Sequence, residues 1–77
     1  MFEEYDVVLV KRAPGEKRDM IGTEDIARRP EPGDVGVVLL CLGLGSNGAN
    51  WYSVECVGDE GATVWLMDLR EDEMQRL

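Results

Sequence analysis

Any chemistry in this chain would rest mainly on its carboxylates and its two cysteines, because the sequence contains no histidine. Histidine is the commonest general base near neutral pH and the commonest metal ligand. The acidic residues form short runs, of which residues 3–6 and 71–73 are the densest. Side chains of neighbouring residues on a helix point in different directions, so such runs do not make an acid–base pair or a cation site. We therefore expect no catalytic residue, no cofactor site and no metal site.

The two cysteines, Cys41 and Cys56, fall inside segments that are typical of strands. If these segments pair as a hairpin, Cys56 lies opposite Val37, which is too far from Cys41 for a disulfide. Two cysteines without other soft ligands cannot hold a structural zinc ion. Glu55 and Asp59 are close to Cys56 in sequence and would raise the pKa of its thiol rather than activate it. The pattern predicts two buried free thiols and a protein that is not an enzyme.

A glycine-rich segment, residues 43–48, matches the G-x-G-x-x-G pattern of dinucleotide-binding proteins. That pattern binds a pyrophosphate only when it follows a strand and opens a helix. Here the segment leads into Trp51-Tyr52-Ser53-Val54, which is typical of another strand. We interpret the segment as the loop of a β-hairpin.

Acidic residues dominate the charge, with 16 acids against 8 bases and a net charge of −8 at pH 7. Such an excess is consistent with solubility alone or with a surface complementary to a basic protein. A nucleic-acid-binding loop is the alternative, although the net charge would repel phosphates and no aromatic residue lies among the bases to stack on a nucleotide. The candidate phosphate-facing residues are Lys11, Arg12, Lys17, Arg18, Arg28 and Arg29.

Short runs rich in β-branched and aromatic residues predict four strands, over residues 5–11, 35–42, 51–57 and 63–67. Pro32-Gly33 predicts a type II turn before the second strand, and Gly36 just inside it predicts a bulge or a close backbone approach. Residues 23–29 could form one helical turn in the long first loop. Asp68 and Glu71 have the spacing of a capping box for a helical turn near the C-terminus.

This order of elements predicts an all-β chain: a small SH3-like barrel of four to five short antiparallel strands, with a long first loop and a short C-terminal helical turn. A length of 77 residues supports a single domain over residues 1–77. No apolar run approaches the ~20 residues that span a bilayer, and the acidic N-terminus is unlike a signal peptide. We expect a soluble cytoplasmic protein.

Three segments resemble a bacterial family catalogued as domain of unknown function 4926. They are Tyr5-Asp6-Val7-Val8, the Pro32–Val38 segment, and Trp51–Cys56 followed by a Gly-Asp-Glu-Gly turn. The resemblance covers about Glu4 to Leu77, and the Gly-Asp-Val-Gly-Val element is also similar to barrels of the nitrile hydratase β-subunit and of KOW-type factors. The resemblance implies an SH3-like fold and no particular activity. The chain departs from the shorter members by extra residues in its loops at 12–33 and 43–50, where a partner could be recognised.

Both faces of the predicted strand 35–42 are apolar, whereas a strand of a small barrel should present one face to solvent. Outward residues there would favour association, unless the first loop or the C-terminal turn covers them. Trp51 is expected at the edge of the barrel beside the glycine loop, where a tryptophan among acids would suit an interface. The candidate partner-binding residues are Val38, Leu40, Leu42, Trp51, Glu55, Asp59, Glu60, Trp65 and Met67.

These features favour a non-enzymatic acidic protein-binding module, either a small subunit of a complex or an inhibitor or immunity-type protein that covers a basic surface. Two alternatives stay open. One is a barrel that binds nucleic acid through the basic first loop, and the other is a structural homodimer formed through the two-sided second strand.

Overall fold

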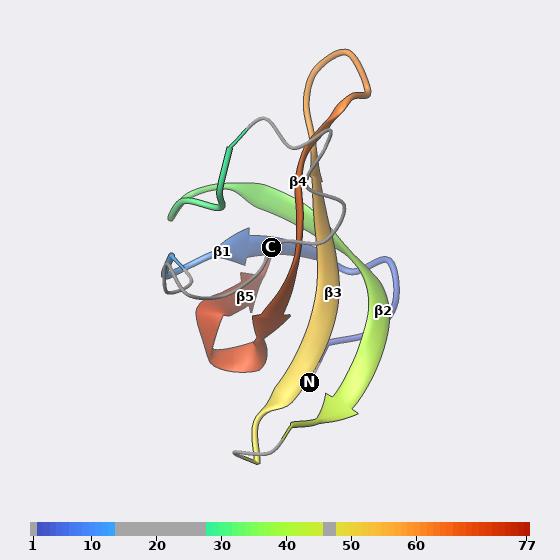
Figure 1. Ribbon diagram of the computed structural model, residues 1–77, viewed down its shortest axis with the longest axis vertical. Coiled ribbons are helices and arrows are strands. Elements are labelled where there is room, and N and C mark those ends of the chain that lie inside the picture. The colour runs from blue at the N-terminus through green and yellow to red at the C-terminus, as the bar shows by residue number, and fades with distance from the viewer. Residues whose placement is uncertain (1, 14–27, 46–47) are drawn as a thin grey trace.

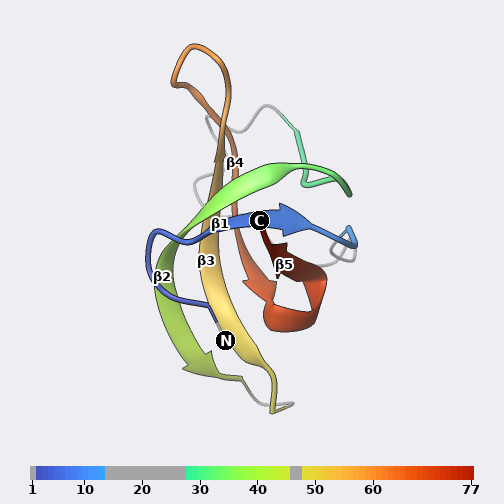
Figure 2. The same ribbon diagram turned by 180° about the vertical axis from the view of Figure 1, so that it is seen from behind.

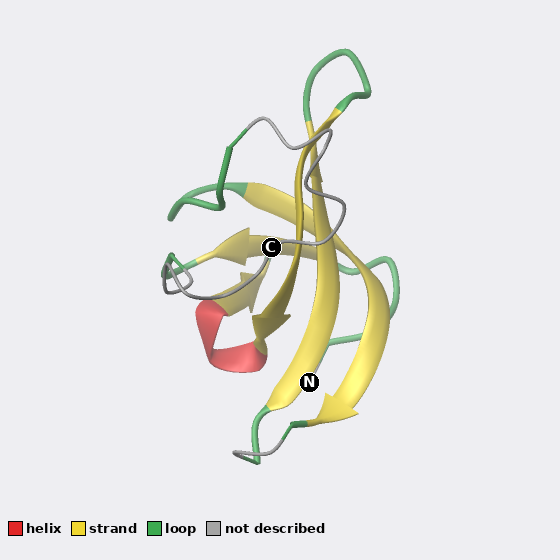
Figure 3. Ribbon diagram, in the orientation of Figure 1, coloured by secondary structure: helices red, strands yellow, loops and turns green. Residues whose placement is uncertain are grey.

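Five antiparallel strands form one strongly curved sheet in the computed structural model, which describes residues 2–13, 28–45 and 48–77 (Figure 1). A short 3-10 turn, η2, lies between the last two strands and is drawn in red in Figure 3. No helix in this described part of the chain is long and apolar enough to cross a bilayer. The elements in chain order are β1 (Val7–Val10), β2 (Val35–Leu44), β3 (Asn50–Val57), β4 (Thr63–Arg70), η2 (Glu71–Glu73) and β5 (Met74–Arg76).

The strands are ordered β4-β3-β2-β1-β5 across the sheet. The first and last strands are therefore neighbours, with Leu9 opposite Gln75, and the 3-10 turn leads the chain from β4 across to β5. Figure 2 shows from behind how β2 and β3 bend around the short strands β1 and β5. This arrangement is that of a small SH3-like barrel, and the predicted all-β fold is confirmed.

The core is built from alternate residues of the strands, because successive side chains of a strand point to opposite faces. In β3 the buried residues are Tyr52, Val54 and Cys56, which is the face expected from the sequence. The N-terminal segment adds Phe2, whose ring meets that of Tyr52 edge to face at 5.4 Å between centroids. The other buried hydrophobic residues are Val8, Val10, Val38, Trp65, Met67, Leu69 and Met74.

The predicted ends of β1 and β4 were wrong. The first strand begins at Val7 rather than at residue 5, because Tyr5 adopts a positive φ of 69° in the turn that precedes it. The fourth strand continues to Arg70, because Leu69 extends the inward alternation of the strand. Arg70 therefore caps the 3-10 turn in place of Asp68, and its backbone N–H donates to the Glu73 carboxylate at 2.8 Å.

The turn before β2 is the one that its sequence predicts. Gly33 has a φ of 95°, and the Asp34 N–H donates to the carbonyl of Glu31 at 3.1 Å. A positive φ at this position is what a Pro-Gly type II turn requires. Residues 23–27 of the predicted helical turn lie outside the described residues.

Gly36 allows close packing of β2 against the core. A Cβ at this position would lie 2.8 Å from Val54 Cγ1 and 3.1 Å from the Glu55 carbonyl. The close approach expected from the sequence is confirmed, whereas the bulges of β2 occur after Val38 and after Cys41.

We expect Gly36→Ala to lower the free energy of unfolding by about 1–3 kcal/mol, because overpacking forces the strands apart. Urea unfolding followed by tryptophan fluorescence measures the change. Gly58→Ala is the matched control, since its Cβ would meet Val64 at an ordinary 3.4 Å. Equal losses in the two variants would contradict the packing role of Gly36.

Candidate protein interface

Three leucines on the second half of β2 are exposed to solvent: Leu40 by 50%, Leu42 by 45% and Leu44 by 74%. We call them the leucine edge. β1 pairs with β2 only over residues 35–37, and the last backbone bonds on that side are made by Val38. Among the described residues no strand follows β2 further, so this half of β2 lies at the margin of the sheet, as Figures 1 and 2 both show.

Two bulges distribute the leucines over both faces of the sheet. Val38 lies opposite the buried Val54, but the register shifts after it and Leu40 lies opposite Ser53. The register shifts again after Cys41, so that Leu44 lies opposite Asn50. Simple alternation had predicted one shared face for Val38, Leu40 and Leu42, which was wrong because each bulge adds a residue to β2.

Three of the predicted contact residues are buried in the core and are not available to a partner. Val38, Trp65 and Met67 each have 0% exposure. In β4, Trp65 lies opposite Cys56 and Met67 opposite Val54, on the face that points inward. These three predictions were wrong.

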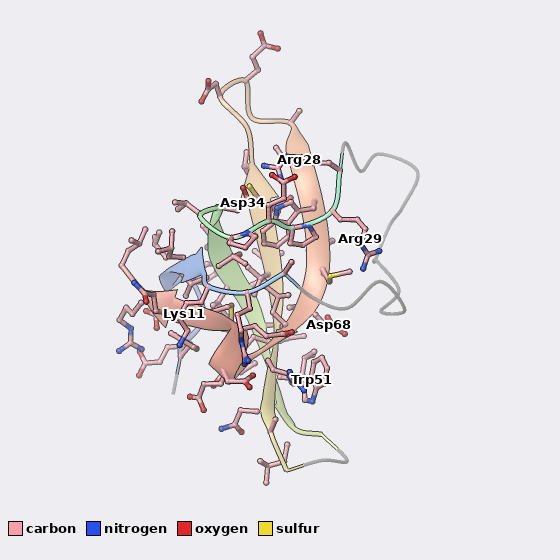
Figure 4. All side chains as sticks on the ribbon, turned by 90° about the vertical axis from the view of Figure 1, so that its left-hand side faces the viewer. Lys11, Arg28, Arg29, Asp34, Trp51 and Asp68 are labelled. Atoms are coloured by element: carbon pink, nitrogen blue, oxygen red, sulfur yellow. The ribbon has the colours of Figure 1, made fainter. Side chains whose placement is uncertain are left out.

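Trp51 lies on the outer face of β3, half-buried, between Gly43 and Arg70 of the neighbouring strands. A Cβ on Gly45 would overlap the indole ring, so the glycine loop allows the ring to lie against it. The expected position beside the glycine loop is confirmed. Figure 4 places Trp51 on the same side of the molecule as Asp68 and Arg29.

The acids Glu55, Asp59 and Glu60, which we call the acidic tip, lie near the other end of β3. Asp59 and Glu60 are exposed in the turn between β3 and β4, and the Thr63 hydroxyl donates to the Glu55 carboxylate at 2.6 Å. Figure 1 shows this turn at the top and the β2–β3 loop at the bottom. Six residues of extended chain separate Trp51 from Val57, about 20 Å, and Asp59 lies beyond Val57 in the turn. The structure therefore does not bring the predicted acids and apolar residues together in one surface.

The candidate phosphate-facing bases do not form a common face. Arg12 is paired with Asp72 at 2.7 Å, and Arg28 is engaged by an acid as described below. Figure 4 places Lys11 and Arg29 toward opposite sides of the molecule. Lys17 and Arg18 lie outside the described residues.

Asp34 binds the segment before β2 to the core. Each of its carboxylate oxygens accepts a hydrogen bond from Arg28 at 2.8 Å, and Oδ2 also accepts from the indole Nε1 of Trp65 at 2.9 Å. The hydrogen bond from Arg28 is the main reason that the pKa of Asp34 falls from 3.8 to about 2. The pKa of Arg28 is raised for the same reason. The cluster is structural, and no pattern in the sequence predicted it.

The sequence also failed to predict the role of Leu44, the most exposed member of the leucine edge. The predicted strand ended at Leu42, before the glycine loop. The alternation of Leu40, Leu42 and Leu44 was the available signal, and it would have extended the strand by two residues.

Both cysteines are free, but only Cys56 is buried; Cys41 is exposed, contrary to expectation. The hairpin register also differs by one residue from the predicted one, because Glu55 rather than Cys56 lies opposite Val37. Burial raises the pKa of the Cys56 thiol. Cys41 lies on the wall of a small pocket of about 170 Å³, which is lined by Phe2, Cys41, Gly43, Asn50 and Tyr52.

The residues 71–73 diverge as expected. Asn50 donates to the carboxylate of Glu71 at 3.5 Å, Asp72 pairs with Arg12, and the buried Glu73 accepts from the backbone of Arg70. Within the described ranges no group of three or more metal-ligating side chains is placed to hold a metal ion.

Comparisons of this chain with family models, with curated proteins and with solved structures find no match. The resemblance noted in the sequence therefore stays a prediction, and the functional argument rests on the surface of the barrel.

Proposed function

We propose that this barrel is a non-enzymatic acidic protein-binding module whose partner presents a basic surface. The chain would be a small subunit of a complex that contains this partner, or an inhibitor that covers the basic surface of the partner. The observation that supports this proposal is the unequal use of charges within the fold. Four of the arginines are engaged by acids of the same chain, whereas Asp59 and Glu60 of the tip are exposed and have no ion-pair partner among the described residues.

Four arginines are engaged in ion pairs with acids of the chain. Their shortest distances are 2.7 Å for Arg12–Asp72, 2.8 Å for Arg28–Asp34, 3.3 Å for Arg70–Asp72 and 2.7 Å for Arg76–Asp6. Within the described part of the chain, Asp59 and Glu60 have no ion-pair partner. With a net charge of −8, the field outside the molecule is negative. Such a field accelerates association with a basic protein and opposes binding of phosphates.

The acidic tip also offers an apolar contact. Val57, at the end of β3, is 46% exposed and lies between Glu55 and Asp59 in the chain. An apolar residue within a ring of charges is a common design of protein interfaces, because the apolar part holds the complex and the charges select the partner. We infer that Glu55, Val57, Asp59 and Glu60 form the centre of the contact.

The non-enzymatic part of the proposal is supported by the kinds of residue at the pocket. Among the described residues its lining includes one thiol, Cys41, and neither a carboxylate nor a base that could activate it. The proposal also places the chain in the cytoplasm, where reduced thiols persist.

Capture from native extract is the first test. The tagged full chain is incubated with extract, with and without nuclease, at about 50 mM and about 500 mM salt, and retained proteins are identified. We expect a stoichiometric basic protein at low salt that is lost at high salt, because screening weakens contacts between exposed charges. A partner that disappears on nuclease treatment would instead support the nucleic-acid alternative, and the acidic-module proposal would be wrong.

A further inference from the structure

The leucine edge has no part in the contact proposed above and lies at the opposite end of the barrel. It belongs to a run of 20 consecutive residues, 35–54, that contains no charged side chain, in a chain of which 31% of residues are charged. Natural proteins usually protect exposed strand edges with charged residues, because an open edge invites another strand to pair with it. An uncharged and apolar open edge is typical of a strand that has a partner.

We propose that this edge pairs with the same edge of a second copy of the chain, in antiparallel orientation, to form a two-fold symmetric dimer. The charge distribution limits where two copies can meet. Two chains of net charge −8 repel each other over most of their surface, and the uncharged hairpin is where they can meet without placing like charges side by side. An open strand edge is also complementary to itself, as a two-fold interface requires.

The acids beside β2 select the antiparallel orientation. The N-terminal segment follows the start of the open edge, since the Tyr5 N–H donates to the Val38 carbonyl at 2.6 Å and Cys41 Sγ contacts the Phe2 carbonyl at 3.5 Å. Glu3 and Glu4, which are exposed, therefore lie beside the Val38 end. In an antiparallel pair they would face the uncharged Leu44 end of β2 of the other copy. In a parallel pair they would face each other, which is unfavourable.

Because of the two bulges, β2 of the second copy would make contacts on both faces of the sheet. Leu40 lies on the outer face, opposite Ser53, and Leu44 lies on the face of Asn50 and Tyr52. A strand along the edge would contact one leucine on each face, and the symmetry would repeat both contacts. Burial of these side chains supplies the driving force, because apolar area removed from water favours association.

Sedimentation equilibrium of the purified full chain tests the dimer, over a concentration series and at low and high salt. We expect a mass of twice 8.6 kDa. We also expect the dimer to strengthen with salt, because salt screens the repulsion between two acidic bodies. Leu42→Lys should raise the dissociation constant of the dimer by at least about ten-fold, because a lysine blocks an open strand edge.

Val57→Lys is the matched control, since Val57 is 46% exposed and Leu42 is 45% exposed, and both changes add one positive charge. Val57→Lys should change the dissociation constant of the dimer by less than about two-fold. Tryptophan fluorescence of both variants confirms that the core around Trp65 is intact. A monomer at every concentration and salt, a larger assembly, or a dimer that Leu42→Lys leaves unchanged would overturn the inference.

Different experimental results would overturn the proposed dimer and the proposed function. A monomeric chain that still captures a basic partner would overturn only the dimer. A dimer that captures no basic partner would overturn only the acidic-module proposal. The opposite salt dependences of the two associations also distinguish them.

Discussion

Replacing Asp34 by alanine is expected to lower the free energy of unfolding by about 2–3 kcal/mol, because a buried donor and a bidentate ion pair lose their acceptor together. The side chain of Asp34 is 12% exposed and accepts hydrogen bonds from Arg28, Trp65 and the backbone of Glu31. Without it, the indole N–H of the fully buried Trp65 has no partner at this position. A domain of this size has roughly 4–11 kcal/mol of total stability, so the loss is a large fraction.

The matched control is Glu31→Ala in the same segment. The Glu31 carboxylate is 67% exposed and 3.7 Å from Arg28, so its removal should cost less than about 0.5 kcal/mol. Urea unfolding at pH 7 measures both variants. If Asp34→Ala and Glu31→Ala are equally stable, the assigned role of Asp34 is wrong.

The same carboxylate gives stability a dependence on pH. Its folded pKa of about 2 lies below the ordinary value of 3.8, so its contribution is complete above about pH 4. The contribution is lost as the pH falls through the folded value, because the unfolded chain binds the proton first. As the pH is lowered from 4 to 2, we expect the free energy of unfolding to fall less in the Asp34→Asn variant than in the native chain.

The residue types predicted the class of fold because the alternation in β3 and β4 is regular. Tyr52, Val54 and Cys56 point inward as their spacing predicts. The same reasoning failed in β2, because a bulge is a property of two paired strands and the sequence of one strand does not reveal it. Val38 was therefore predicted on the same face as Leu40, whereas the two residues lie on opposite faces of the sheet.

The candidate surface was harder to predict than the fold. The acids and the leucines were expected in one interface, in which the apolar residues hold the complex and the acids attract a basic partner, but β3 runs the length of the barrel and separates them. The Asp34 cluster joins residues 31 positions apart, and only the curvature of the sheet brings Asp34 to Trp65. Contacts of this kind depend on tertiary packing, which composition and spacing do not specify.

Charge reversal at the acidic tip is expected to have the largest effect on partner binding. The double variant Asp59→Lys, Glu60→Lys should weaken binding of the captured basic protein by about 100-fold, because two attractive contacts become repulsive. Both residues are exposed in a turn, so the free energy of unfolding should change by less than about 0.5 kcal/mol. Isothermal titration calorimetry measures the affinity.

Charge reversal elsewhere provides the control for this result. Glu3→Lys with Glu4→Lys makes the same change in net charge on exposed residues away from the tip. We expect at most a few-fold weakening from it through the general field of the molecule. Equal losses in the two double variants would mean that net charge, rather than the tip, determines binding.

The salt dependence of the affinity for the captured partner tests the central claim most directly. The native chain and the tip variant are titrated with that partner between about 50 mM and 500 mM salt. We predict that the affinity of the native chain falls steeply with salt and that the tip variant shows weak binding with a much smaller salt dependence. An affinity of the native chain that does not change with salt would contradict the proposal that this barrel recognises a basic surface through its acids.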